Sequence, residues 1–361
     1  MSDIYNFKNF VDNLKQNLNN LQQKSQYRDF KSIEKLKPLH FLKDNKELIS
    51  FSCNDYFGLS SNFMQGEGGS GSARLINGTG NTYLQLEKNI ANIKNTESAL
   101  IFGSGYLANL GVISCLANKH DLIIADKLCH ACIIDGAKLS NAKLKRYKHN
   151  DLKHLKKLLE NRNNYQNCFI ITETIFSMDG NLAPLNELYE IAEQYNAVLI
   201  SDDAHGLYNQ NYKSHVKIGT FSKAIGTYGG YVASDKVVID YIKNYARSFV
   251  FSTALPPALI QKTTDNLALI KQNNYADLAL DNAKYFAELM SLKTPNSCII
   301  PLIIGDNIKA FEISKKLEKN GFLVSVIRPP TVPASTTRLR LTFSALHKKE
   351  DIKTLANLLI L

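Results

Sequence analysis

Short apolar runs alternate with helical stretches through the middle of this 361-residue chain. Six strand-sized runs follow one another from about Glu97 onward: Ala99–Phe102, Leu122–Ala125, Cys168–Thr172, Val198–Ser201, Val216–Thr220 and Gly230–Ala233. Alternation of strands and helices is typical of βαβ units, in which helices cover both faces of a parallel sheet. We therefore predict an α/β fold built on a mainly parallel sheet.

The two ends of the chain have different patterns. Residues 5–25 carry apolar side chains at three- and four-residue spacing, which predicts an amphipathic helix that packs on a larger body. After Pro256-Pro257 the pattern predicts a long helix, and a second alternating block then has strands near Ile299–Ile304, Leu323–Ile327 and Arg338–Phe343. We predict three parts from these patterns: an N-terminal helical arm (1–47), a large domain (48–272) and a smaller C-terminal α+β domain (273–361).

The composition narrows the class of protein. The net charge of +10 would suit a nucleic-acid partner, but the basic residues are dispersed among asparagines, so we expect no such partner and only a mild preference for anionic substrates. No apolar stretch approaches the roughly 18 residues of a membrane span. The first residues lack the pattern of a secretory signal, and the six cysteines have no framework spacing. We therefore expect a cytoplasmic protein without a membrane partner.

The segment Cys129-His-Ala-Cys132 has the residue types of a metal or haem site. A zinc site would need a second Cys/His pair at matching spacing, and haem attachment would need a histidine where this chain has Ile133. We therefore predict no metal ligand here.

A glycine-rich turn follows the first apolar run of the sheet. Gly103-Ser-Gly-Tyr106 ends a predicted strand and opens a helical pattern, so free backbone N–H groups could bind a phosphate there. A dinucleotide fingerprint would need a third glycine, where the chain has Ala108. Taken alone, the motif predicts either an anion site or an ordinary tight turn.

Polar residues gather directly after the other apolar runs, where parallel sheets keep their sites. Glu173 ends one run, and Asp202, Asp203 and His205 follow another. An acid in this place could keep a cationic ring nitrogen protonated, although it could also cap the next helix.

Lys223 lies within Thr220-Phe-Ser-Lys223, after a further strand, among small residues. Desolvation there could remove its charge and make it an amine nucleophile. A phosphate cradle, an acid directed at a ring and an imine-forming lysine are together what pyridoxal phosphate requires. We therefore predict that Lys223 holds this cofactor as a Schiff base.

The order of these segments resembles the α-oxoamine synthases, a family of fold-type-I pyridoxal-phosphate enzymes. The resemblance covers almost the whole chain and rests on eight segments: Asn54-Asp-Tyr-Phe-Gly-Leu-Ser60, Gly68-Gly-Ser-Gly71, Asp126-Lys-Leu-Cys-His130-Ala, Thr172-Glu-Thr-Ile-Phe-Ser-Met-Asp-Gly180, Asp202-Asp-Ala-His-Gly206, Thr220-Phe-Ser-Lys223, Ser252-Thr-Ala-Leu-Pro-Pro257 and Arg328-Pro-Pro-Thr-Val-Pro333. It implies a large domain with a mainly parallel seven-stranded sheet flanked by helices, a smaller α+β domain, and a homodimer with active sites at the interface.

The resemblance also implies roles for the residues around the cofactor ring. Lys223 would form the Schiff base and later move the Cα proton, and Asp202 would pair with the ring nitrogen. His205 would bond the ring hydroxyl. His130 would stack on the ring face and contact substrate, which gives Cys129-His-Ala-Cys132 a role without metal.

Further positions are implied for the phosphate and the substrates. The Gly105 and Tyr106 amides with Thr220 would hold the phosphate, and Ser177 would lie near the ring. The substrate contacts implied by the resemblance are Arg28, Asn54, Thr331 and either Arg328 or Arg340, between which the sequence does not choose.

The branch that the chain resembles most condenses L-alanine with pimeloyl-CoA or pimeloyl-acyl carrier protein, with loss of carbon dioxide, in biotin biosynthesis. Two segments are shorter than is usual in the family, between Ser60 and Gly68 and between His205 and Thr220, which bears on acyl-chain recognition. Another family activity stays open, such as that of 2-amino-3-ketobutyrate CoA ligase, serine palmitoyltransferase or 5-aminolevulinate synthase. A hydride-transferring dehydrogenase or a basic nucleic-acid-binding protein would leave Lys223 unexplained.

Overall fold

The structure is a computed structural model that describes residues 7–30, 32–206 and 212–360. The chain forms two compact units. The large unit comprises Cys53–Ile300 and Thr342–Lys353, and the small unit comprises Met1–Ser52, Pro301–Leu341 and Thr354–Leu361. The domain boundaries predicted from the sequence, after residues 47 and 272, stay a prediction.

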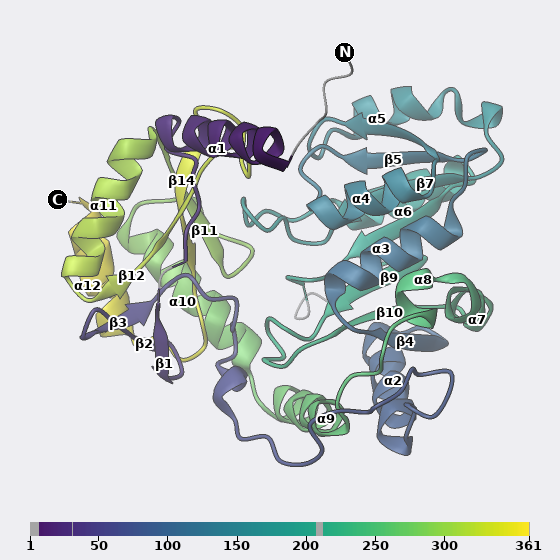
Figure 1. Ribbon diagram of the computed structural model, residues 1–361, viewed down its shortest axis with the longest axis horizontal. Helices are drawn as coiled ribbons and strands as arrows, with labels where there is room; N and C mark the ends of the chain where they lie inside the picture. The colour runs from purple at the N-terminus through teal and green to yellow at the C-terminus, as the bar shows by residue number, and fades with distance from the viewer. Residues whose placement is uncertain (1–6, 31, 207–211, 361) are drawn as a thin grey trace. The chain divides into compact units, whose positions relative to one another are not determined.

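A seven-stranded sheet forms the centre of the large unit (Figure 1). Its strands, in spatial order, are β4 (Ser98–Phe102), β10 (Gly230–Ser234), β9 (Val216–Thr220), β8 (Val198–Asp202), β7 (Cys168–Glu173), β5 (Leu122–Asp126) and β6 (Lys143–Tyr147). Strands β6, β5, β7, β8 and β9 are parallel, and β10 is antiparallel to both of its neighbours. The predicted mainly parallel sheet is therefore confirmed.

Alternate residues of the strands face two different helical layers. Ile123 packs in a core cluster with residues of α3 (Gly105–Leu116) and α4 (Ala131–Leu139). Its neighbour Ile124 packs with residues of α5 (Leu152–Leu159) and α6 (Leu185–Gln194). Because successive side chains of a strand point to opposite faces, continuous apolar runs are what a sheet covered on both sides requires.

The remaining helices of the large unit lie beside this framework. They are α2 (Asn81–Lys94), α7 (Lys236–Tyr245), α8 (Arg247–Val250), α9 (Pro257–Gln272) and α10 (Tyr275–Leu289), with short 3₁₀ turns at Leu59–Ser61 and Arg162–Asn164. Helix α9 begins at the predicted Pro256-Pro257, where proline suits the first helical turn. None of the described helices combines the length and the apolar composition that crossing a membrane requires.

Residues 7–50 and 299–360 contain, in their described parts, two small sheets and three helices. They are α1 (Phe7–Gln23), β1 (Glu34–Lys37), β2 (His40–Lys43), β3 (Lys46–Ser50), β11 (Ile299–Gly305), α11 (Asn307–Lys319), β12 (Phe322–Leu323), β13 (Ser325–Ile327), β14 (Thr337–Thr342) and α12 (Lys349–Ile360). One sheet has the order β1-β2-β3-β12 and the other β11-β14-β13.

Two details of this part differ from the sequence prediction. The single strand expected at 323–327 is interrupted at Val324, because β12 pairs with β3 while β13 pairs with β14. The sequence predicts a helical arm over 1–47. Among its described residues, 7–30 and 32–47, α1 is the one helix, and the arm continues as three antiparallel strands. The predicted amphipathic helix is present, but none of its residues is buried.

Candidate active site

A cavity of about 240 Å³ lies in the large unit, lined by residues that follow the carboxyl ends of parallel strands. Its lining comprises Ser104, Gly105, Tyr106, Asn109, His130, Cys132, Glu173, Ser177, Asp202, Ala204, His205, Thr220, Ser222 and Lys223. The structure thus brings together all eight residues that the sequence assigned to the cofactor.

A hydrogen-bonded chain extends from Lys223. The Lys223 Nζ lies 2.8 Å from Nε2 of His205, and the other ring nitrogen, Nδ1, lies 2.7 Å from the Tyr56 hydroxyl. Tyr56 in turn donates to Oδ1 of Asn54 at 3.3 Å. When Nδ1 donates to Tyr56, Nε2 is left as an acceptor toward Lys223. Asn54 is therefore connected to the site through Tyr56, a residue that the sequence analysis did not assign.

Asp202 lies at the end of β8 with a buried carboxylate. Its Oδ1 accepts from the Ala204 N–H at 2.9 Å, and its Oδ2 accepts from Nδ2 of Asn109 at 2.9 Å. Burial raises the pKa of Asp202, while the charge of Lys223 and these hydrogen bonds oppose the shift. A buried carboxylate of this kind would gain a cationic partner from a protonated ring nitrogen.

His130 follows β5 and caps the N-terminus of α4. Its Nδ1 accepts from the Cys132 N–H at 3.3 Å and lies 3.0 Å from the Cys132 sulfur. Burial lowers the pKa of His130, with the nearby Lys223 charge acting in the same direction and Asp202 opposing. The ring is therefore neutral near pH 7, with its proton on Nε2.

Glu173 joins two loops that line the cavity. Its Oε1 accepts from the His130 backbone N–H at 2.7 Å, and its Oε2 accepts from the Ser177 N–H at 3.2 Å. Burial raises the pKa of Glu173 to about 8, with the Asp202 charge adding to the shift. Glu173 follows a predicted strand, but no role in the site could be assigned to it from the sequence.

The part of the cavity lined by the start of α3 fits a phosphate. Ser104 caps α3 by accepting from the Leu107 N–H at 3.1 Å, so the helix N-terminus begins at Gly105. A Cβ at Gly105 would lie 3.0 Å from Cβ of Thr220, so a side chain there would fill the space between them. A helix N-terminus beside a hydroxyl and an unobstructed glycine is an anion site, and the residues present therefore fit pyridoxal phosphate.

The other predicted substrate residues lie in the small unit. Arg28 donates to the Thr331 hydroxyl at 3.1 Å, and Arg328 donates to the Tyr27 carbonyl at 2.7 Å. Desolvation, with the charge of Arg28, lowers the pKa of Arg328, and the buried Arg328 Nε has no hydrogen-bond partner among the described residues. Arg340 is buried on β14.

The comparisons with known proteins identify the family. The model of the class I and II aminotransferases matches residues 46–359. The chain belongs to this family, and it is an enzyme of the fold-type-I pyridoxal-phosphate class. Within the class it belongs with the 8-amino-7-oxononanoate synthases. The synthase of Granulibacter bethesdensis is 41% identical over an alignment of 338 residues, and the match covers 88% of this chain and 88% of that protein.

Two solved structures share the fold. Serine palmitoyltransferase of Sphingomonas wittichii has a TM-score of 0.89 at 26% identity and covers 98% of this chain and 97% of its own. The 8-amino-7-oxononanoate synthase of Francisella tularensis has a TM-score of 0.71 at 28% identity, with 86% and 96% covered. The predicted fold class, enzyme class and cofactor are therefore confirmed.

Proposed function

We propose that this chain condenses L-alanine with a pimeloyl thioester and releases 8-amino-7-oxononanoate, carbon dioxide and the free thiol carrier, a step of biotin biosynthesis. The observation that supports it most directly is the cavity in which Lys223, Asp202, His205 and His130 meet. The relatives are named for the product, 8-amino-7-oxononanoate, and the family resemblance of the sequence implies the two substrates.

Three residues of the cavity would have separate roles in the reaction. When bound, pyridoxal phosphate supplies an electron sink for the negative charge that develops at the alanine Cα. Lys223 would hold the cofactor and then take and return the Cα proton, since its amine lies beside a histidine acceptor. Asp202 would keep the ring nitrogen protonated, and His205 would bond the ring hydroxyl.

The remaining lining residues would hold the cofactor in place. The Gly105 and Tyr106 amides with Thr220 would bind the phosphate at the N-terminus of α3. His130 would lie on the ring face and donate Nε2–H to the substrate, while Ser177 would contact the ring from the next loop.

The small unit supplies arginines for the substrate carboxylates. No carboxylate of the described residues forms an ion pair with Arg28 or Arg328. Arg28 donates to the Thr331 hydroxyl, and the charge of Arg28 contributes to the lowered pKa of Arg328. We assign these three residues to the distal carboxylate of the pimeloyl group and Arg340 to the carboxylate of alanine, because planar guanidinium groups suit carboxylates. Asn54 belongs to the substrate contacts as well. The acyl carrier, CoA or carrier protein, is left open by these residues.

A homodimer is part of the proposal. Large apolar side chains are exposed on loops of the large unit, among them Phe63, Ile76 and Phe251, which are 83%, 80% and 73% exposed. Contact with a second copy of the chain would remove such apolar side chains from water. Mass measurement in solution tests it, and a monomer at micromolar concentration would contradict it. The cytoplasmic location, proposed from the scattered cysteines, is tested by cell fractionation.

The first experiment is the visible spectrum of the protein with pyridoxal phosphate, before and after L-alanine and then pimeloyl-CoA. We expect a yellow absorption band that alanine shifts, and turnover that exceeds that with glycine and acetyl-CoA or with serine and palmitoyl-CoA. Lys223→Ala should abolish the band and turnover while the circular dichroism spectrum stays unchanged. A colourless protein would refute the cofactor site, and a preference for another substrate pair would refute the assigned reaction.

A further inference from the structure

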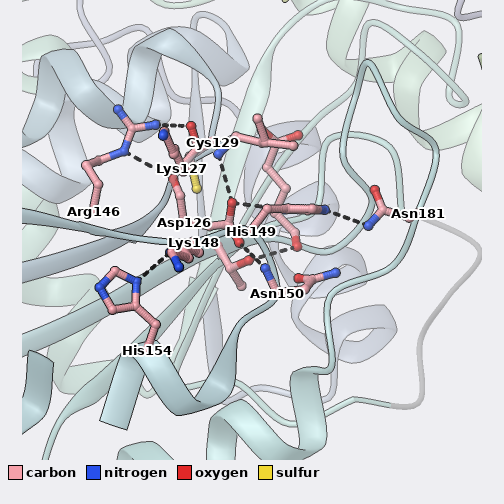
Figure 2. Close-up of polar contacts among 12 residues, drawn as sticks. Asp126, Lys127, Cys129, Arg146, Lys148, His149, Asn150, His154 and Asn181 are labelled. Atoms are coloured by element: carbon pink, nitrogen blue, oxygen red, sulfur yellow. Dashed lines mark hydrogen bonds and ion pairs between the residues drawn. The ribbon is translucent and has the colours of Figure 1, made fainter. Parts of the chain in front are cut away.

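A partly buried polar network lies outside the cavity, at the carboxyl end of β5 (Figure 2). Asp126 is fully buried there, and its carboxylate accepts from the Leu128 N–H at 2.8 Å and from the Asn150 N–H at 2.9 Å. Nδ1 of His149 lies 3.1 Å from the same carboxylate. Asp126 therefore connects two loops. One is the loop after β5, which continues to His130, and the other is the loop that follows β6.

His149 extends this network to a third segment. Its Nε2 lies 2.7 Å from the side-chain amide of Asn181, as Figure 2 shows, and its ring packs edge-on against Phe176 with centroids 4.3 Å apart. The neighbouring Asn150 donates to the Leu182 carbonyl at 2.9 Å. Phe176 and Asn181 bracket Ser177, and they are themselves joined by a backbone hydrogen bond of 3.0 Å.

The arrangement uses both nitrogens of the imidazole. Nδ1–H donates to Asp126 and Nε2 accepts from the Asn181 amide. Burial alone would lower the pKa of His149, but the hydrogen bond and charge of Asp126, together with Asp179 and Asn181, raise it overall. Protonation keeps the connection, because an amide can turn its oxygen toward Nε2–H.

We propose that His149 is a positioning residue for the cofactor site. It holds the loop that carries His130 and the segment that carries Ser177 at a fixed separation, although neither His149 nor its partners Asp126 and Asn181 line the cavity. The inference rests on the proposed function, which assigns His130 and Ser177 to the cofactor. Residues that support a site from behind set the geometry of the groups in front of them.

A matched pair of histidine variants tests the proposal. His154 lies in the same region and accepts at Nδ1 from the Lys148 N–H at 2.9 Å, so His154→Ala also loses one histidine hydrogen bond (Figure 2). We expect His149→Ala to raise the dissociation constant of pyridoxal phosphate by up to about tenfold, as for the loss of one hydrogen bond to a charged group, and His154→Ala to change it less than about twofold. His149→Ala should also shift the absorption band of the bound cofactor and lower kcat more than it raises KM for alanine. Equal effects of the two variants would overturn the proposal.

A second variant covers the case in which His149→Ala does not fold. Asn181→Leu keeps the approximate volume and removes only the amide partner, so it should also weaken cofactor binding. Unchanged cofactor affinity in Asn181→Leu would overturn the proposal. Thermal unfolding of the cofactor-free variants gives an independent reading: the losses in His149→Ala and Asn181→Leu should be less than additive in the double variant. Additive losses of stability would refute the connection between His149 and Asn181, even in a chain that binds no pyridoxal phosphate. If the unmodified chain does not bind pyridoxal phosphate, only the proposed function is refuted.

Discussion

The buried ion pair behind Asp202 permits a quantitative prediction. Lys94, at the end of α2, pairs with Asp203, and their side chains are only 1% and 0% exposed. Asp203 also accepts from the Thr174 hydroxyl at 3.0 Å and directly follows the carboxylate assigned to the ring nitrogen. Lys94→Met keeps most of the aliphatic volume and leaves Asp203 as a buried charge without its cation.

Removing one partner of a buried ion pair typically costs about 3–5 kcal/mol. Lys217 is also buried near this pair and donates to the Lys94 carbonyl at 2.8 Å. Burial and the charge of Lys94 lower the pKa of Lys217, so loss of Lys94 would favour a charged Lys217 and compensate in part. We therefore expect the low end of that range. For domains of roughly 150–250 residues, Tm falls by about 2–4 °C per kcal/mol of lost stability, and the smaller value suits the large unit, so Tm should fall by about 6 °C.

Thermal unfolding followed by circular dichroism measures the effect. Lys94→Met combined with Asp203→Asn should recover at least half of the loss, because removing both charges leaves none unpaired. The exposed pair of Lys236 and Asp240 supplies the control, and Lys236→Met should leave Tm unchanged. A single Lys94→Met variant with the Tm of the unmodified chain, or a double variant no more stable than the single one, would refute the reasoning.

Three further predictions concern the site and the substrate arginines. Burial raises the folded-state pKa of Glu173 from 4.5 to about 8, so the cofactor-free protein should lose stability as the pH rises from about 4.5 to about 8. Glu173→Gln should make this fall in the free energy of unfolding smaller. Urea titrations at several pH values measure it. Gly105→Ala should weaken cofactor binding on the order of tenfold, because the new Cβ would crowd Thr220. Gly68→Ala is the control and should leave binding unchanged, because its Cβ would meet no atom within 4 Å. Equal dissociation constants for the two variants would contradict the assigned phosphate site. Arg328→Gln should raise KM for pimeloyl-CoA roughly tenfold or more and leave KM for alanine unchanged, and steady-state kinetics with an opposite pattern would reassign this residue.

The sequence predicted the strands of the large sheet best where the chain is apolar on both faces. Strand β6 was missed because it is an edge strand with exposed positions. Its sequence, Lys143-Leu-Lys-Arg-Tyr147, is mostly polar and lacks the apolar run that identified the other strands. The break at Val324 was also missed, because apolar periodicity says nothing about which neighbour a strand pairs with.

The candidate site shows a similar limit. Lys223, Asp202 and His205 could be selected because each follows an apolar run whose end lies at the carboxyl edge of the sheet. Tyr56 and Asn109 could not, because their partners are 149 and 93 residues away in the chain. A polar asparagine in the otherwise apolar start of α3 was the one local signal for Asn109.

The capping of α4 by His130 determines which ligands can approach that ring. One nitrogen is already occupied by the Cys132 N–H, so the ring can offer a ligand only a hydrogen-bond donor. Carboxylates, carbonyls and phosphonates would be recognised at this position, while an ammonium group would face N–H. Inhibitor chemistry directed at this pocket should therefore place an acceptor oxygen in the plane of the imidazole, facing Nε2–H, and analogues with an amine there should bind weakly.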